Sequence, residues 1–377
     1  MGCLFSGPLQ KTNGNQISSN YSNYSQNGAF SPNAYNQNEE QGENNENAQK
    51  FFSFSEFIQQ NTKPMIFEYL FYKDEIGKGA MSRVYLCTNT ENSESCAAKV
   101  YNQSLLNRQN LGNEEPPILA VKREIEIMTS LSHRYILPII EVIDDSCTNS
   151  LIIVLPFAPE GTLQSYVDRK KPDEKTFQIC FFELAESLRY AHENNVVHRD
   201  LKPDNLLVFS DTLFKLSDFS VSTRVSGDDE QLSDTRGSPA FLSPEECATK
   251  SFFPKPADVW AYGVTLFGCI FGFLPFNLDK AQGKSVANTI FAVAQLLNTE
   301  ELVVPEDKGF SPHLSELLKQ ILQKEPSKRP TFEEIVKSPW FEGLEEIDNA
   351  NEEEFQRKFA ELMKEEEEEE AEDPQGE

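Results

Sequence analysis

One eight-residue string restricts the chemistry of this chain more than any other feature. Residues 198–205 read His-Arg-Asp-Leu-Lys-Pro-Asp-Asn, and Asp218-Phe219 follows thirteen residues after Asn205. Phosphoryl transfer needs a carboxylate that takes the proton of the attacking hydroxyl, and oxygen ligands that hold magnesium against the phosphates. Asp200 fits the first role, and Asn205 and Asp218 fit the second. A lone His-Arg-Asp or Asp-Phe match arises by chance in many folds, but the whole string almost never does.

This string resembles the catalytic segment of the eukaryotic protein kinases. The resemblance implies that ATP donates the phosphate, that Mg2+ is the metal cofactor, and that the acceptor is a protein. It also implies a two-lobed α+β fold, with a small, mostly antiparallel β lobe that carries helix C and a larger, mostly helical lobe. We expect the kinase domain at 68–341, with the N lobe at 68–154, the hinge at 155–158 and the C lobe at 159–341.

The phosphate-covering hairpin of kinases has a counterpart in residues 76–84, which follow a strand-like run over residues 67–72. Glycines there let backbone N–H groups approach the phosphates. Ser82 stands where the third glycine of the pattern would be, and alone this segment fits a simple hairpin turn. Downstream, Cys96-Ala97-Ala98-Lys99 leads into a lysine that the resemblance places on the third strand, at the α- and β-phosphates.

Lys99 needs a carboxylate partner, and Glu124 opens an amphipathic stretch that runs to Leu131. We therefore expect Glu124 to be the partner on helix C. Glu126 is the alternative, although two residues along a helix it faces elsewhere.

The hinge of the resemblance corresponds to Leu155-Pro156-Phe157-Ala158, which an apolar strand precedes. Kinases use only the backbone carbonyl at the position of Pro156, so its missing N–H costs nothing there. The N–H of Ala158 would then pair with adenine. In all, the expected ATP contacts are Ile76, Gly77, Lys78, Gly79, Val84, Ala97, Lys99, Leu155, Pro156, Ala158 and Asp218.

Several features match the serine/threonine kinases. Lys202 follows Asp200 at the spacing of that class, and residues 237–245 read Gly-Ser-Pro-Ala-Phe-Leu-Ser-Pro-Glu. Ser238 would contact both Asp200 and Lys202. Further similarity over residues 258–267 and 217–222, and an insertion that contains Pro116-Pro117, resembles the calcium/calmodulin-dependent protein kinase kinases and the related activators of AMP-activated kinase. Such enzymes phosphorylate other kinases, which makes another kinase a candidate substrate.

Departures from the kinase pattern bear on the activity of the protein and on its regulation. The Asp-Phe-Gly triplet of kinases is Asp218-Phe219-Ser220 here, and serine resists a positive φ, so loop flipping would slow. Together with Ser82, this change allows a pseudokinase scaffold that binds nucleotide or partners without transferring phosphate. In addition, no basic amphipathic helix follows the C lobe, which argues against direct calmodulin binding.

The activation loop carries a possible built-in charge. The resemblance puts Arg199 in a basic pocket that a phosphate usually neutralises. The phosphorylated residue usually lies four positions before the hydroxyl residue, which is Ser238 here. That position is Asp234, so a fixed carboxylate could replace the phosphate. Thr235 or Ser233 is the alternative, as the true phosphorylated switch.

Two further expectations concern the C lobe. Residues 259–276 carry no charge and contain a Gly-x-x-x-Gly pattern, as a membrane helix would. We expect instead the buried helix of the kinase C lobe, with Asp258 hydrogen-bonded to the catalytic-loop backbone. Arg329 resembles the buried partner of Glu245 in the family.

The flanking segments differ in composition. The first 50 residues contain 11 Asn and 6 Gln with almost no aliphatic residues, so we expect a disordered tether over residues 1–60. Residues 341–377 hold 17 acidic and 3 basic residues, a net charge of −14 of the −27 of the chain. This acidic tail, which we start at residue 342, makes nucleic acid an improbable partner. Within it, Phe355, Phe359, Leu362 and Met363 recur at helical spacing and favour packing on the C lobe.

The N-terminal residues and the cysteines bear on location. Met1-Gly2-Cys3-Leu4-Phe5-Ser6 matches the N-myristoylation pattern, with Cys3 as a palmitoylation candidate. Seven cysteines at irregular spacing, without a Cys-x-x-Cys pair, indicate a reducing compartment rather than disulfides or a metal site. We expect a cytoplasmic protein that acylation of Gly2 and Cys3 holds at the cytoplasmic face of a membrane.

Overall fold

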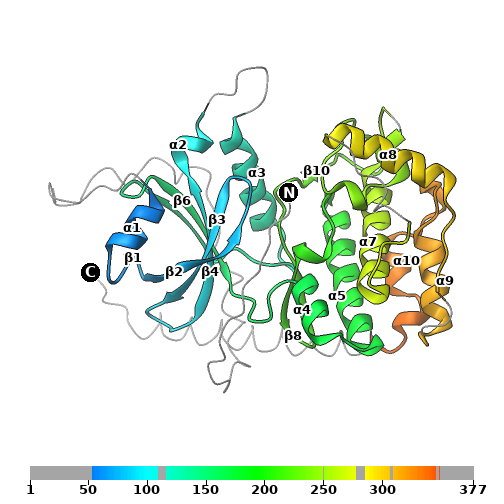
Figure 1. The fold of residues 1–377 in the computed structure, drawn as a ribbon, viewed down its shortest axis with the longest axis horizontal. Helices are drawn as coiled ribbons and strands as arrows, with labels where there is room; N and C mark the ends of the chain where they lie inside the picture. Colours follow the sequence, from blue (N-terminus) through cyan, green and yellow to red (C-terminus); the bar gives the residue numbers. More distant parts are fainter. Residues whose placement is uncertain are drawn as a thin grey trace, which may run out of the picture.

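The computed structural model describes residues 53–108, 116–248, 250–276, 285–305, 309–344 and 348. These residues form a sheet-containing lobe and a larger helical lobe, which lie side by side in Figure 1. The two-lobed α+β fold expected from the sequence is therefore present. The acylation candidates, the helical repeat around Phe359 and most of the acidic tail lie outside the described residues.

The N lobe is built on one antiparallel sheet with the strand order β1-β2-β3-β4-β6-β5. Its central strands have apolar side chains on both faces, because helices cover both sides of the sheet. In chain order the strands are β1 (Met65–Ile66), β2 (Tyr69–Lys78), β3 (Ser82–Asn89), β4 (Ser95–Asn102), β5 (Glu141–Asp145) and β6 (Ser150–Pro156).

A short helix, α1 (Phe54–Gln60), covers one face of this sheet. Ser53 caps it by accepting a hydrogen bond from the Glu56 N–H at 3.2 Å. Phe54 and Ile58, four residues apart, are 5% and 1% exposed, and Phe54 packs edge-on against Phe71 with ring centroids 5.0 Å apart. The prediction that disorder extends to residue 60 is therefore wrong for this stretch, since burial of two large side chains offsets the entropy of ordering it.

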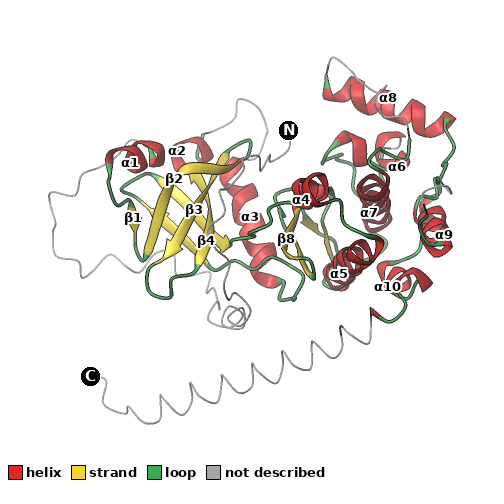
Figure 2. Ribbon diagram, turned by 60° about the horizontal axis from the view of Figure 1, so that its bottom comes forward, coloured by secondary structure: helices red, strands yellow, loops and turns green. Residues whose placement is uncertain are grey.

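The opposite face of the sheet carries α2 (Gln103–Leu106) and α3 (Pro117–Ser130). In Figure 2, α3 lies between the sheet and the helical lobe. It begins at Pro117, seven residues before the start expected from the sequence, because proline is well suited to the first turn of a helix. Glu124 consequently lies in the middle of α3, on its buried side, whereas the alternative Glu126 is exposed.

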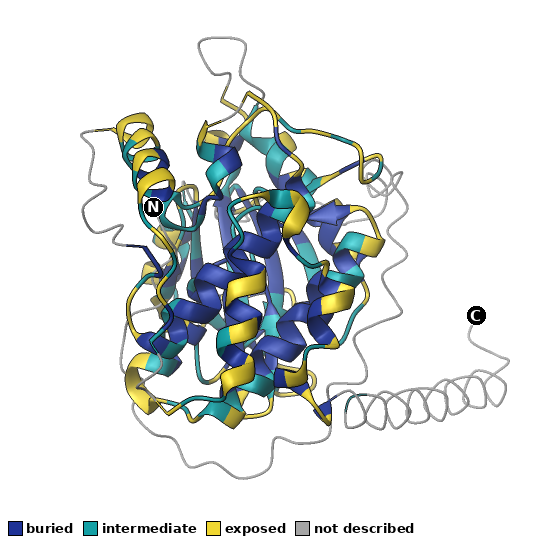
Figure 3. Ribbon diagram, turned by 90° about the vertical axis from the view of Figure 1, so that its right-hand side faces the viewer, coloured by how far each residue is buried: buried dark blue, intermediate teal, exposed yellow. Residues whose placement is uncertain are grey.

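The C lobe is mostly helical, with short two-stranded pairs on the side that faces the N lobe. Figure 3 shows its helices with buried residues turned inward and exposed residues outward. Its helices and strands in chain order are α4 (Leu163–Lys170), α5 (Glu174–Glu193), β7 (Val196–Val197), η3 (Pro203–Asn205), β8 (Leu206–Ser210), β9 (Leu213–Leu216), β10 (Thr223–Arg224), η4 (Pro239–Phe241), α6 (Pro244–Ala248), α7 (Pro254–Phe271), α8 (Val286–Thr299), α9 (Pro312–Ile321), η6 (Pro326–Lys328), α10 (Phe332–Val336) and η7 (Pro339–Phe341).

Helix α7 contains most of the uncharged run that looks like a membrane segment. It is buried along nearly its whole length inside the C lobe, and it ends at Gly272, whose φ is 78°. Trp260 of this helix stacks on Phe276, with ring centroids 5.5 Å apart. Of the helices that the structure describes, none is long and apolar enough to cross a membrane.

Candidate active site

The catalytic loop, residues 198–205, follows β7, and Asp258 of α7 holds its backbone. The buried carboxylate of Asp258 accepts hydrogen bonds from the His198 and Arg199 N–H groups, both at 2.8 Å, and contacts His192 Nε2 at 3.0 Å. Burial alone would raise the pKa of Asp258, but these bonds hold it below its usual value. The contacts stabilise the backbone at Arg199, whose φ of 71° is unfavourable for a side-chain-bearing residue. The expected bond from Asp258 to the loop backbone is present.

Gly237 allows the activation segment to approach this loop. Its φ is 93°, and a Cβ at this position would overlap the carbonyl oxygen of Arg199. Only glycine therefore fits both the backbone conformation and the space. The close approach places Ser238 directly beside Asp200.

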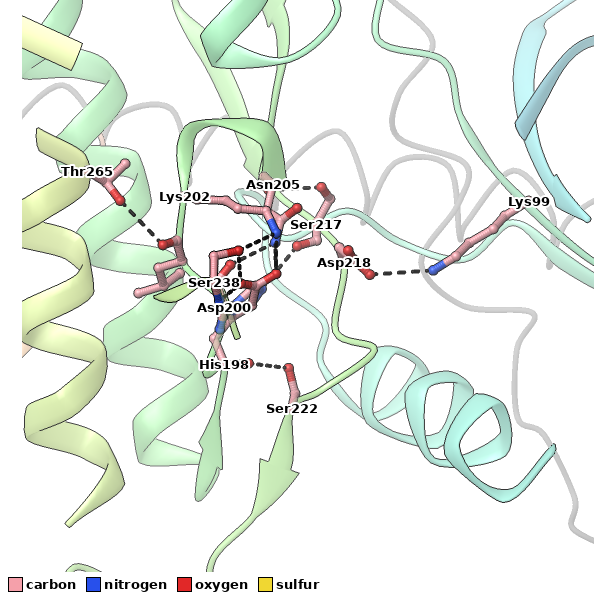
Figure 4. A network of polar contacts seen from close by, with 11 residues as sticks. Lys99, His198, Asp200, Lys202, Asn205, Ser217, Asp218, Ser222, Ser238 and Thr265 are labelled. Carbon is pink, nitrogen blue, oxygen red and sulfur yellow. Dashed lines mark hydrogen bonds and ion pairs between the residues drawn. The ribbon is translucent and has the colours of Figure 1, made fainter. Parts of the chain in front are cut away.

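Four donors converge on the Asp200 carboxylate (Figure 4). Oδ1 accepts from the Ser238 N–H and from Ser238 Oγ, both at 2.9 Å. Oδ2 accepts from Lys202 Nζ and, at 3.1 Å, from Asn205 Nδ2. Lys202 also donates to Ser238 Oγ at 3.1 Å. The contact of Ser238 with both residues, expected from the serine/threonine pattern, is thus present.

Asn205 connects Asp200 to the segment that carries Asp218. Its side-chain nitrogen Nδ2 also donates to the Asp200 backbone carbonyl at 2.7 Å, and the Asn205 backbone carbonyl accepts from Ser217 Oγ at 2.8 Å. With the amide nitrogen engaged on Asp200, the side-chain oxygen of Asn205 is the atom suited to a metal ion. Asp218 and Asn205 thus offer oxygen atoms of the kind that a divalent metal ion shared with phosphates would need.

Asp218 has a cation and a hydroxyl as neighbours. Lys99 Nζ lies 3.5 Å from Asp218 Oδ1, and the Ser220 side chain favours the ionised form of the same carboxylate. Burial would raise the pKa of Asp218, but these neighbours bring it below its usual value, so the carboxylate stays ionised. The positive φ in this triplet, 61°, belongs to Asp218, and Ser220 is not among the residues with positive φ. In this conformation Ser220 therefore does not need the backbone freedom of a glycine, and the slower loop flipping expected from the sequence stays a prediction.

The predicted pair between Lys99 and Glu124 joins β4 to α3. Lys99 Nζ donates to Glu124 Oε1 at 2.6 Å. Burial alone would lower the pKa of Lys99, but the Glu124 and Asp218 carboxylates raise it well above its usual value. Phe219, which is 1% exposed, packs edge-on against His198 with ring centroids 5.0 Å apart. Helix α3 and the Asp218 segment therefore lie in the arrangement that brings Lys99, Glu124 and Asp218 together.

Most of the expected nucleotide contacts lie on adjacent strands of the sheet. Lys78 pairs with Arg83 across the β2–β3 hairpin, and the Gly79 N–H donates to the Ser82 carbonyl at 3.0 Å. On the neighbouring strands, Val84 pairs with Lys99, and Ala97 pairs with Leu155. Pro156 ends β6, and Ala158 follows it at the junction of the lobes. The register thus gathers on adjacent strands residues that are far apart in the sequence.

The activation segment is tied to the catalytic loop through Asp234. Arg199 Nη2 donates to the Asp234 carbonyl oxygen and, at 3.0 Å, to its Oδ1, while Arg236 Nε donates to Oδ2 at 2.6 Å. Burial opposes ionisation of Asp234, but the two arginines lower its pKa. Thr235 instead donates from Oγ1 to the Glu246 carbonyl at 3.0 Å. Asp234, rather than Thr235, therefore occupies the Arg199 pocket.

Two contacts near the site were not foreseen from the sequence. Tyr101 Oη donates to Glu124 Oε2 at 3.1 Å, and Tyr135 Oη donates to Asp348 at the start of the acidic tail. Tyr101 had one available signal: it lies two residues after Lys99 on the same strand, so both side chains face the same way. Nothing in the sequence indicated the contact of Asp348.

Comparison with known proteins agrees with this geometry. The protein kinase domain profile matches residues 71–341. The chain belongs to the protein kinase family. This kinase is 35% identical to the serine/threonine-protein kinase GRIK1 of Arabidopsis thaliana, over 71% of the chain and 65% of the relative. It is 32% identical to a calcium/calmodulin-dependent protein kinase kinase of Caenorhabditis elegans, over 71% of the chain and 51% of the relative.

These relatives place the kinase domain in the serine/threonine class, as the pattern around Lys202 and Ser238 predicts. The similarity to the calcium/calmodulin-dependent protein kinase kinases also agrees with the sequence analysis. The aligned part spans between about half and two thirds of the length of these relatives. Members of this family use ATP and a divalent metal ion.

Proposed function

We propose that this protein is a catalytically active kinase that transfers the γ-phosphate of ATP to a serine or threonine hydroxyl of another protein. One observation carries the proposal. Lys99 contacts both Glu124 and Asp218, and Asn205 contacts Asp200, so these five side chains form two groups of polar contacts in one site. The test is phosphate incorporation into a generic basic protein, followed by identification of the modified residues. Phosphoserine and phosphothreonine are expected, and phosphotyrosine alone would contradict the proposal.

The roles of the residues follow from their chemistry. Asp200 orients the acceptor hydroxyl and takes its proton, Lys202 offsets the charge beside it, and Lys99 binds the α- and β-phosphates. Asn205 and Asp218 would hold Mg2+, which would neutralise charge on the phosphates. Phosphate transfer should therefore stop when EDTA is added and return with excess Mg2+. Transfer that persists in EDTA would contradict the metal role.

The pseudokinase alternative rests on Ser220 and Ser82. The Ser220 side chain favours the ionised form of Asp218, and Ser220 has no positive φ, so this substitution is compatible with a metal-binding Asp218. Ser82 is buried at the start of β3, where its backbone carbonyl accepts from Gly79. Neither substitution removes a ligand or a donor from the site, which favours the active kinase.

We also propose that the substrates include other protein kinases, phosphorylated on their activation loops. The support is the similarity to a relative whose name describes a kinase of a kinase. An array of activation-loop peptides, including those of AMP-activated-type kinases, tests this substrate class. Preferential labelling of these peptides over composition-matched scrambled peptides is expected, and equal labelling would contradict it. Direct control by calmodulin is not part of the proposal.

Location at the cytoplasmic face of a membrane is a separate proposal. A single myristoyl chain binds membranes only marginally, so stable anchoring would need Gly2 and Cys3 together. Cell fractionation of wild type, Gly2→Ala and Cys3→Ser tests this. We expect wild type in the membrane fraction, Gly2→Ala in the soluble fraction and Cys3→Ser divided between them. The same distribution for wild type and Gly2→Ala would contradict the proposal.

A further inference from the structure

Two residues of β4 hold the carboxylate of Glu124. Lys99 Nζ donates to Oε1 at 2.6 Å, and Tyr101 Oη donates to Oε2 at 3.1 Å. Because Lys99 and Tyr101 are two residues apart on one strand, both side chains project from the same face of the sheet toward α3. Each oxygen of the carboxylate therefore has its own donor on β4.

The ring of Tyr101 is fixed by its packing. It is 4% exposed and belongs to an apolar cluster that also contains Val121 and Ile125 of α3 and Leu151 of β6. Val121 and Ile125 flank Glu124 in the sequence, so the same helical surface that carries the carboxylate also contacts the ring. The position of the hydroxyl is thus set by the contact between the sheet and α3.

The hydroxyl of Tyr101 is a donor at neutral pH. Burial raises the pKa of Tyr101 above its usual value, so the hydroxyl keeps its proton there. Lys99, by contrast, divides its ammonium group between Glu124 and Asp218, at 2.6 and 3.5 Å. Glu124 is only 3% exposed, and a buried carboxylate oxygen without a donor is unfavourable.

We propose that Tyr101 is a positioning residue for phosphoryl transfer. Its hydroxyl holds the second oxygen of Glu124, and thereby holds α3 in the orientation in which Glu124 presents Lys99 to the nucleotide. The inference rests on the proposed function, since it assigns a role in the same reaction. The role of Tyr101 can be tested separately from that of Lys99, because phenylalanine at position 101 would preserve the packing of the ring and remove only the hydroxyl donor.

The experiment compares full-length wild type with Tyr101→Phe and with Tyr69→Phe as a matched control. Tyr69 is also buried in the N-lobe sheet, and the carboxylate of Glu141 is close enough to raise its pKa, but Tyr69 belongs to the cluster on the opposite face, under α1. Two quantities are measured: kcat and KM for ATP in peptide phosphorylation, and the hydrogen exchange of the α3 backbone amides without nucleotide.

For Tyr101→Phe we expect kcat/KM for ATP to fall by about tenfold, the size of one lost hydrogen bond to a charged group. KM should rise as kcat falls, because the folded protein itself binds ATP less well. Partial unfolding would instead lower kcat at unchanged KM, which would count against a positioning role. Exchange within α3 should become faster in Tyr101→Phe, and both quantities should stay within about twofold of wild type in Tyr69→Phe.

Wild-type kinetics and wild-type α3 exchange in Tyr101→Phe would overturn the inference. Equal changes in the two phenylalanine variants would also overturn it, because they would show a general loss of N-lobe stability. The exchange measurement needs no phosphoryl transfer. A wild-type protein that transferred no phosphate would therefore refute the proposed function, while α3 exchange would still decide whether Tyr101 holds the helix.

Discussion

Arg329 donates to both carboxylate oxygens of Glu245, from Nη1 at 2.6 Å and from Nη2 at 2.7 Å. The Arg329 side chain is fully buried, and its guanidinium also donates to the Pro256 carbonyl at 2.8 Å and lies over the ring of Trp260. This pair joins Arg329, at the end of η6, to α6, the helix that follows the activation segment in the chain. It was expected from the sequence resemblance, and the contact is present.

Replacing Arg329 by alanine should destabilise the fold, because it leaves the Glu245 carboxylate buried without its cation. Breaking such a pair costs about 3–5 kcal/mol. Thermal melting should show a much lower midpoint for Arg329→Ala than for wild type. Lys328→Ala is the control, since Lys328 is an exposed neighbour whose ion pair, among the described residues, is with Glu325. An unchanged midpoint in Arg329→Ala would refute the structural role.

Replacing Lys99 by methionine should remove most phosphoryl transfer while the fold remains intact. The methionine keeps much of the side-chain volume but contributes no charge to Glu124, Asp218 or the phosphates. Phosphate incorporation and the melting midpoint should be measured on the same preparation. Loss of activity together with loss of the cooperative melting transition would show a folding defect and contradict the assigned role.

Activity should not depend on phosphorylation of the activation loop, because the Asp234 carboxylate already occupies the pocket of Arg199. Phosphatase treatment of the purified kinase should leave its activity unchanged. Asp234→Ala should lower activity by about two- to fivefold, the size expected for a half-exposed ion pair. Thr235→Ala, the matched neighbour, should behave as wild type. The reverse pattern, with loss on dephosphorylation or in Thr235→Ala only, would contradict this account.

Helix α1 should contribute to the stability of the N lobe although it precedes the residues that match the kinase domain profile. Phe54→Ala removes a buried ring that contacts Phe71 and Tyr85, and such truncations cost about 3–5 kcal/mol. Phe67→Ala is the control, because Phe67 is 69% exposed. Equal melting midpoints for the two variants would show that α1 does not contribute to the fold.

The parts of the site that could be predicted from the sequence are those encoded by contiguous strings. Residues 198–205 and the Asp218 triplet are contiguous motifs, and the resemblance to kinases that they carry implied that Asp200, Asn205 and Asp218 lie in one site. The start of α3 was placed too late because the prediction relied on the amphipathic pattern after Glu124 and did not use Pro117. Helix α1 was missed because the Asn/Gln-rich composition before it outweighed the spacing of Phe54 and Ile58.

Contacts that depend on register and backbone geometry could not be read from the sequence. Tyr101 meets Glu124 only because β4 presents one face to α3, and that face is set by pairing with β3 and β6. For the Asp218 triplet, the sequence pattern drew attention to the backbone of Ser220, whereas the positive φ belongs to Asp218. Local sequence identifies which residue types are present, but the tertiary structure decides which of them adopts the unusual conformation.

The most direct test of the account is phosphate transfer from ATP by wild type and by Asp200→Asn. The Asn side chain has nearly the same shape as Asp but lacks the charge that takes the hydroxyl proton, so the fold and nucleotide binding should remain. We expect wild type to label serine and threonine residues of a basic protein, and Asp200→Asn to lose nearly all of this labelling. Equal incorporation by the two proteins would contradict the central claim that this site catalyses the reaction.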